Sequence, residues 1–229
     1  MLFRSLVEEW LVRYRMVLSD AEDKALASGP FRPTGDGALE RELRGVDGQS
    51  FRLRLREGDL AEETVVETQR HRYGMLFLGV PRTWKKTHRI LQFAAPPTLV
   101  VRRFVPDEYG FLVCVDGTEA SKRALRMATR IAKVLVAPLE VLAVAGKGLP
   151  EPEARRELDR AAAYLERSAV PHRLRLEHGD IEPVILRSAT ASTIITLGAS
   201  RKSQIWQFLL GTMTFRVAAQ AQGPVLVVK

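Results

Sequence analysis

The residues that most clearly indicate the fold are FLVCVDGTEASKRALRMATRIAKVLV, at positions 111–136. The first six form a short apolar run that predicts a β-strand. The remainder predicts a helix, because small and apolar residues recur on one helical face, namely Ala120, Ala124, Ala128, Ile131 and Leu135. A strand that leads into a helix of this length is typical of a βαβ unit, and hence of a parallel sheet.

The same alternation continues to the end of the chain. Further strands are predicted at 139–145, 172–177, 193–198 and 224–229, and helices at 151–168, 181–191 and 212–222. We therefore predict an α/β fold with a mostly parallel sheet flanked by helices. Ligands of such sheets bind at the carboxyl ends of the strands, so the candidate site is expected there.

The chain also matches itself at three places in the same order. The order of the matches predicts two copies of one unit. The matched pairs are FRLRLREGDL (51–60) with HRLRLEHGDI (172–181), MLFLGVPR (75–82) with TIITLGASR (193–201), and PPTLVVR (96–102) with QGPVLVVK (222–229).

We predict two domains from this repeat, a truncated first copy at 1–104 and a complete second copy at 105–229. The first copy lacks the opening strand and turn. In their place are an amphipathic helix near the N-terminus and a Gly/Pro-rich loop, ASGPFRPTGDG, at 27–37. It also lacks a counterpart of LLGTMT. We expect the last strands of the copies, TLVVR and VLVVK, to pair, since an apolar edge strand needs a partner.

Composition limits the functional classes. The net charge is +8, but residues 1–104 and 105–229 each contribute +4, which is more typical of a solvated surface than of a nucleic-acid footprint. The only segment that hints at nucleic-acid binding is RTWKKTHR at 82–89. No apolar run is long enough to span a membrane, and no secretory signal is present, so we expect a cytoplasmic protein.

Metal and disulfide sites are not expected. The single cysteine, Cys114, lies in the apolar run FLVCV and is predicted to be a small buried residue. The four histidines, His71, His88, His172 and His178, lack metal-ligand spacing. No catalytic constellation is present either, so we predict a binding protein with at most weak hydrolytic activity and no catalytic residue.

Three segments together resemble a universal stress protein domain: FLVCVDGTEASKRAL, HGDI and IITLGASRKSQIWQFLLGTMTFRVAAQAQGPVLVV. The resemblance covers 110–229, with 50–103 as a degenerate partial copy. It implies two tandem α/β units, each with a mostly parallel sheet, the first of them truncated. Many members of the family are tandem domains or homodimers. One branch binds ATP, and another lacks nucleotide.

The resemblance also implies a set of site residues. The binding branch carries Gly, two residues, Gly, nine residues, then Gly with Ser or Thr. Here Gly198 and the pair Gly211–Thr212 keep that spacing, but Arg201 replaces the second glycine. Met213 and Thr214 fit the phosphate-contacting stretch that follows. Asp116 matches an acid near the adenosine, and the Val144 backbone is where the adenine edge is read.

Physical chemistry supports a phosphate site and also leaves alternatives open. Gly211–Thr212 is expected at the amino end of the last helix, where free N–H groups favour an anion. It can equally be a loop followed by a threonine cap. Asp116 can belong to a turn that caps the next helix, and Gly198 can be a strand-end turn. Arg201 can block phosphate, bind it with its guanidinium, or point to solvent.

Three functions follow. The first is a cytoplasmic regulatory module whose second domain binds ATP, ADP or AMP, with or without Mg²⁺, and which forms a dimer or binds another protein. The second is a nucleotide-free dimerising scaffold. The third is anion or nucleic-acid binding through the arginines of 52–56 and 173–175, where a strand with one wet face is the simpler interpretation.

Overall fold

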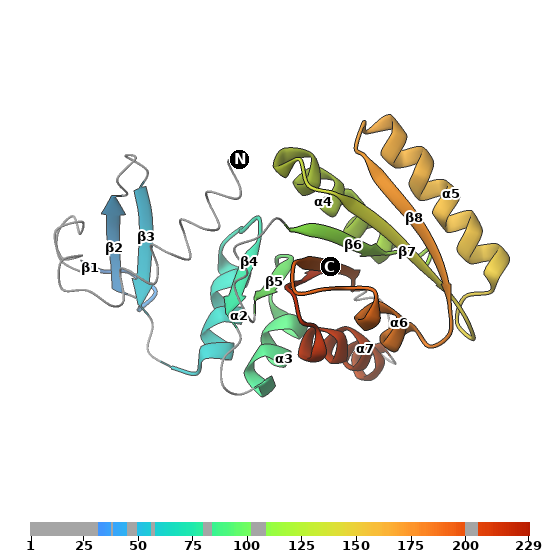
Figure 1. Cartoon of the computed structure of the whole chain (residues 1–229). Helices are drawn as coiled ribbons and strands as arrows, with labels where there is room; N and C mark the ends of the chain where they lie inside the picture. Colours follow the sequence, from blue (N-terminus) through green and yellow to red (C-terminus); the bar gives the residue numbers. More distant parts are fainter. Residues whose placement is uncertain are drawn as a thin grey trace. The chain divides into compact units, whose positions relative to one another are not determined.

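The computed structural model describes residues 32–37, 39–44, 50–55, 58–79, 84–101, 109–199 and 206–229 (Figure 1). The chain divides into two compact units, residues 2–63 and residues 64–229. The predicted amphipathic helix near the N-terminus lies outside the described residues. The predicted domain boundary between residues 104 and 105 stays a prediction. No helix in the described part of the chain is both long and apolar enough to cross a membrane.

The smaller unit contains an antiparallel sheet of three strands, β1 (Arg32–Pro33), β2 (Leu39–Arg44) and β3 (Ser50–Leu55). Part of the predicted loop at 27–37 therefore forms β1, and the turn that follows it is closed by a hydrogen bond from Gly37 N–H to the Thr34 carbonyl at 3.1 Å. The alternating Arg-Leu segment forms a strand, as predicted.

The larger unit is built on one sheet of seven strands in the order β4-β5-β10-β9-β6-β7-β8. All neighbours are parallel except β5 and β10. The strands are β4 (Leu76–Gly79), β5 (Thr98–Val101), β6 (Gly110–Cys114), β7 (Leu139–Ala145), β8 (His172–His178), β9 (Thr193–Gly198) and β10 (Val225–Val228). The helices are α2 (Leu60–Arg70), which begins in the smaller unit, α3 (Trp84–Phe93), α4 (Glu119–Leu135), α5 (Glu151–Arg167), α6 (Ile181–Arg187) and α7 (Trp206–Gln220).

Helices cover both faces of this sheet. On one face, α4 and α5 pack against Phe111, Val113 and Val141. On the other face, α3, α6 and α7 pack against Leu112 and Leu142. Successive residues of a strand point to opposite faces, so a strand buried on both sides reads as a continuous apolar run. This burial explains why the runs at 111–115 and 139–145 lack a polar-apolar alternation.

The predicted pairing of the last strands of the two copies is confirmed. β5 and β10 pair antiparallel, with Leu99 opposite Leu226. These two leucines are counterparts in the sequence repeat, so the paired strands β5 and β10 are related by a local two-fold axis. We call this strand pair the joint between the copies. The pairing of β4 with β5 likewise places Gly79 opposite Val101, as the pairing of β9 with β10 places Gly198 opposite Val228. The matched segments thus adopt matched strand registers.

Candidate functional site

The strand order places a cavity at the carboxyl ends of the central strands. The chain leaves β6 toward β7 and β8 on one side and returns through β9 and β10 on the other, so the connections diverge between β6 and β9. Such a switch point is where parallel sheets hold ligands. A cavity of about 330 Å³ lies there, lined by Cys114, Val115, Asp116, Ser121, Leu142, Val144, Gly146, Lys147, Gly148, Leu149, Gly179, Asp180, Ile181, Leu197, Gly198 and Met213.

Four of the predicted site residues come together in this cavity, namely Asp116, Val144, Gly198 and Met213. Thr214 is buried in α7 and is not among the lining residues. Arg201 lies outside the described residues, so the three interpretations of this residue stay open.

The expected position of Gly211–Thr212 at a helix terminus is wrong. α7 begins at Trp206, and both residues lie in its second turn. The prediction treated the glycine as the start of the helix, but the preceding segment WQFLL is rich in residues that are compatible with a helix. A single glycine inside a helix costs about 1 kcal/mol and does not end it. The free N–H groups at the start of α7 therefore belong to earlier residues.

Asp116 follows β6 and organises the turn into α4. Its Oδ1 accepts hydrogen bonds from the N–H and the hydroxyl of Thr118, at 3.0 and 2.7 Å. Thr118 in turn caps α4 by accepting from the Ser121 N–H at 3.1 Å. The capping interpretation of this segment is thus confirmed. Both bonds use Oδ1, which leaves Oδ2 without a hydrogen-bond partner among the described residues.

Val144 presents an unpaired backbone donor and acceptor. The Leu142 carbonyl accepts from Val115 N–H at 2.9 Å on the β6 side, and the Ala145 carbonyl accepts from Gly179 N–H at 3.0 Å on the β8 side. Backbone groups alternate along a strand, so the N–H and C=O of Val144 point toward the β6 side. β6 ends at Cys114, and neither group of Val144 has a hydrogen-bond partner among the described residues. Paired buried backbone groups are the rule, so this pair is a candidate for ligand contacts.

Gly198 is required where β9 meets α4. A Cβ at this position would lie 2.2 Å from the carbonyl carbon of Ala120 and 2.4 Å from the nitrogen of Ser121. Because both contacts are with backbone atoms, no side-chain rotation can relieve them. The glycine therefore has a packing role that does not depend on any ligand.

The sequence analysis missed Lys147 and Asp180, which also line the cavity. Lys147 lies on the turn between Gly146 and Leu149, which is closed by two backbone hydrogen bonds of 2.9 and 3.3 Å. The available signal for Lys147 is a Gly-Lys-Gly segment directly after the strand at 139–145. Asp180 was used only as a marker of the repeat.

The two copies use the aspartate of this repeated segment differently. In the first copy, Asp59 Oδ1 accepts from the N–H groups of Ala61 and Glu62, at 2.9 and 3.2 Å, at the start of α2. In the second copy, Asp180 precedes α6 but makes no capping hydrogen bond with its side chain. Asp180 is instead one of the residues that line the cavity.

Cys114 is not a candidate nucleophile. Burial raises the pKa of its thiol to about 12, with a further contribution from the negative charge of Asp116. Thiolate is the reactive form of cysteine, so this side chain stays protonated near neutral pH. It is half-buried and forms part of the cavity wall.

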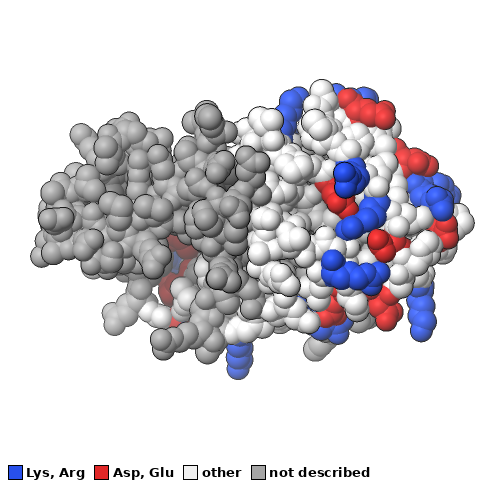
Figure 2. Space-filling model, in the orientation of Figure 1, with Lys and Arg blue, Asp and Glu red and all other residues white. Residues whose placement is uncertain are grey.

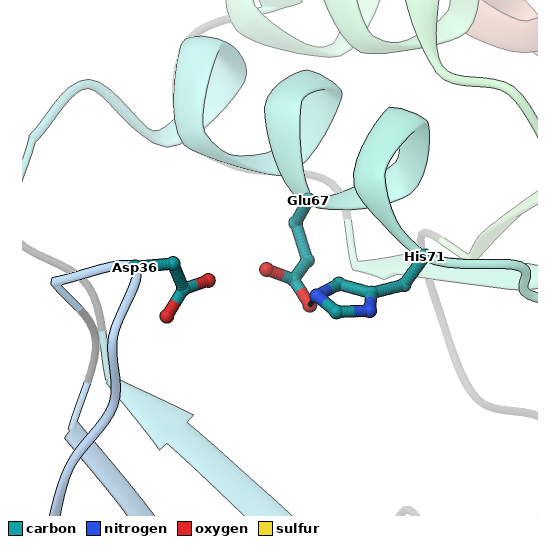
Figure 3. Close-up of side chains that lie close together, drawn as sticks. All are labelled: Asp36, Glu67 and His71. Atoms are coloured by element: carbon teal, nitrogen blue, oxygen red, sulfur yellow. Dashed lines mark ion pairs between the residues drawn. The ribbon is translucent and has the colours of Figure 1, made fainter.

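Two ligand-type side chains, Glu67 on α2 and His71 directly after this helix, lie close together (Figure 3), with 3.7 Å between Glu67 Oε1 and His71 Nε2. Glu67 also accepts a hydrogen bond from the Tyr73 hydroxyl at 2.5 Å. Asp36, drawn in the same view, belongs to the smaller unit, where it accepts from the Thr34 hydroxyl at 2.5 Å. A glutamate of a helix and a histidine just after it, four residues apart, form an ordinary surface pair.

Arg175 of β8 and Arg187 of α6 are each paired with an acid. Arg175 Nε lies 2.7 Å from Glu140 Oε1, and Arg187 lies 3.3 Å from Glu177. Positive and negative side chains are interspersed on the face drawn in Figure 2. This pairing favours the wet-face interpretation of the segment at 173–175 over a nucleic-acid surface.

Comparisons with known proteins agree with this architecture. The universal stress protein family model matches residues 111–229. A universal stress protein from Archaeoglobus fulgidus DSM 4304 is 16% identical with a TM-score of 0.60, over 75% of this chain and 66% of its own, just under two thirds of its length. A protein from Pseudomonas aeruginosa UCBPP-PA14, described as a universal stress protein, is 20% identical with a TM-score of 0.58, over 76% of this chain and 69% of its own.

A universal stress protein solved in complex with cAMP is 20% identical with a TM-score of 0.45, over 53% of this chain and 97% of its own. No curated protein matches the chain.

Proposed function

Because the chain belongs to the universal stress protein family, we propose that residues 105–229 bind an adenine nucleotide (ATP, ADP or AMP) and act as a regulatory module. The observation that carries this proposal is the unpaired N–H and C=O of Val144 at the wall of a cavity of about 330 Å³. An adjacent donor and acceptor match the hydrogen-bonding edge of adenine.

The neighbouring strands offer groups for the rest of the nucleotide. Asp116, at the end of β6, keeps Oδ2 available to accept from a ribose hydroxyl. The phosphates then extend toward the end of β9 and the start of α7, where the free N–H groups of a helix favour an anion. Mg²⁺, where present, enters with the phosphates. The chain itself supplies binding and orientation, and we assign no residue a catalytic role.

We further propose that the first copy, within residues 1–104, is a degenerate universal stress protein unit that gives the second copy a pseudo-twofold partner. Its support is the symmetric pairing of β5 with β10 and the equivalent register of β4 and β9. The predicted cytoplasmic location, the predicted homodimer and an additional protein partner belong to the same proposal. Because β5 already occupies the β10 edge, a homodimer has to use another surface.

A nucleotide-free scaffold is the second candidate function. Gly211–Thr212 lies within α7 rather than at its start, and Arg201 replaces a motif glycine. Both departures favour a chain that keeps the fold and has lost the ligand.

Thermal unfolding with ATP, ADP, AMP and adenosine separates the two candidates, with sulfate at matched ionic strength as control. Ligand at 100 times its dissociation constant stabilises a protein by about 2.7 kcal/mol, which raises the Tm by about 5–10 °C for a chain of this size. We expect Asp116→Ala to abolish most of the shift. Asp159→Ala, which changes an exposed aspartate on α5 outside the cavity, is the matched control. The absence of a shift with all four compounds would contradict nucleotide binding and favour the scaffold.

A further inference from the structure

The second copy leaves one acid at the cavity without a structural task. Asp59 and Asp180 occupy the same position of the repeated Gly-Asp segment, and each follows a glycine with positive φ, +146° at Gly58 and +123° at Gly179. The backbone is therefore similar at both sites. Asp59 caps its helix with two hydrogen bonds, whereas Asp180 makes no capping bond. An aspartate that precedes a helix without capping it is available for another contact.

Contacts between the carboxyl ends of β7 and β8 fix the position of Asp180. A Cβ on Gly146 would lie 2.8 Å from the carbonyl oxygen of Gly179, so the turn that carries Lys147 touches the segment that carries Asp180. Both residues, Lys147 and Asp180, line the cavity. A hydrogen bond between His178 Nε2 and Glu151 Oε2, at 2.9 Å, connects the end of β8 to the start of α5.

The order of the strands sets which part of a ligand meets Asp180. Along the carboxyl edge of the sheet, β9 comes first, then β6 with Asp116, then β7 with Val144, then β8 followed by Asp180. In the function proposed above, the phosphates lie toward β9, the ribose at Asp116 and the base at Val144. In this order Asp180 follows Val144 on the side away from Asp116. This position corresponds to the outer edge of the bound base.

We propose that Asp180 determines base specificity by accepting a hydrogen bond from the exocyclic amino group of adenine. The inference rests on the nucleotide site proposed above. An ionised carboxylate only accepts hydrogen bonds, so it favours a base with a 6-amino group and opposes one with a 6-oxo group. A site whose polar group is left unpaired by the wrong ligand discriminates strongly. Lys147 is the competing group, because an ammonium only donates and would favour a 6-oxo base.

The test compares the affinities of ATP and ITP, which carry a 6-amino and a 6-oxo base on the same sugar and phosphates. We expect the full-length protein to bind ATP at least about tenfold more tightly than ITP, as a charge-assisted hydrogen bond predicts. In Asp180→Asn the amide can accept from an amino group or donate to an oxo group. The ATP/ITP ratio is then expected to fall by at least about threefold, mainly because ITP binds better, while the backbone groups of Val144 still favour ATP.

Two matched variants define the contradicting outcomes. Asp59→Asn changes the counterpart aspartate, and the ratio should stay as in the unmodified protein. An unchanged ratio in Asp180→Asn, or a ratio that changes in Lys147→Gln instead, would overturn the role of Asp180 while nucleotide binding stands. Failure of both ATP and ITP to bind would instead contradict the proposed function itself, and with it this inference.

Discussion

The two copies of the repeat contain similar strands that end in different surroundings. In the second copy β9 lies between β10 and β6, and β8 pairs with β7. In the first copy β4 is the edge of the sheet, and β3 pairs with β2 in a separate antiparallel sheet. One difference explains both outcomes. In the tandem arrangement proposed above, the first copy lacks a counterpart of β6, α4 and β7, which would leave β4 at the sheet edge and β3 without a parallel partner.

This comparison shows that the sheet a strand joins depends on the partners available to it. The segments FRLRL and HRLRL are nearly identical, yet one is antiparallel and the other parallel. Strand propensity reflects a fit to a pleated, half-buried surface and does not choose the neighbour. The segment that the first copy lacks thus affects three features: the sheet that β3 joins, the position of β4 at the sheet edge, and the surroundings of the glycine that ends β4.

The largest effect is expected from the joint between the copies. Deletion of residues 225–229 removes β10, which lies between β5 and β9 and whose residues are almost completely buried. The deletion leaves two apolar strands with open edges, and we expect a loss of cooperative unfolding together with aggregation. Circular dichroism and light scattering measure both. A soluble, fully folded truncated protein would contradict the picture of a joint that both copies need.

A smaller effect distinguishes the two glycines that end β4 and β9. Gly198→Ala places a Cβ against the backbone of Ala120 and Ser121, whereas no described atom lies within 4 Å of a Cβ at Gly79. We expect Gly198→Ala to lower the free energy of unfolding by about 3 kcal/mol or more, and Gly79→Ala to change it by less than about 0.5 kcal/mol. Denaturant titration measures both. Equal losses for the two variants would mean that the contact with α4 does not make Gly198 more sensitive to substitution than Gly79.

The smallest effect concerns the two aspartates of the Gly-Asp segment. Asp59→Ala removes two capping hydrogen bonds and should lower the free energy of unfolding by about 1 kcal/mol. Asp180→Ala removes no capping bond, and the expected change in the absence of ligand is below about 0.5 kcal/mol. Urea titration of both variants tests the contrast. A larger loss for Asp180→Ala would show that this side chain has a structural task after all.

The sequence predicted much of this fold because its signals are local or repeated. The strand-helix alternation of 111–229 and the apolar face of α4 gave the correct architecture. The similarity of TLVVR and VLVVK indicated that the two segments meet. Separate packing of β3 was not predictable, because its sequence is that of β8 and the cause lies in a segment that is missing.

The candidate site was predicted only in part, for a related reason. Asp116 lies just after β6 and Val144 near the end of β7, and a strand end is a strong local signal. Lys147 and Asp180 become candidates only when the turn after β7 is known to touch the turn after β8, a contact between positions more than 30 residues apart. The start of α7 was mistaken because Gly211 looked like a boundary, although the apolar residues before it continue the helix.

The antiparallel joint has a consequence for how the two halves associate. Two separate chains that met along such strands would dissociate on dilution. Here β5 and β10 are parts of one chain, so their encounter is intramolecular and its effective concentration is set by the connecting residues, independent of the amount of protein in solution. The halves cannot be exchanged with those of another protein of the same fold without displacing a tethered strand. The pairing of β5 with β10 is therefore expected to be independent of protein concentration.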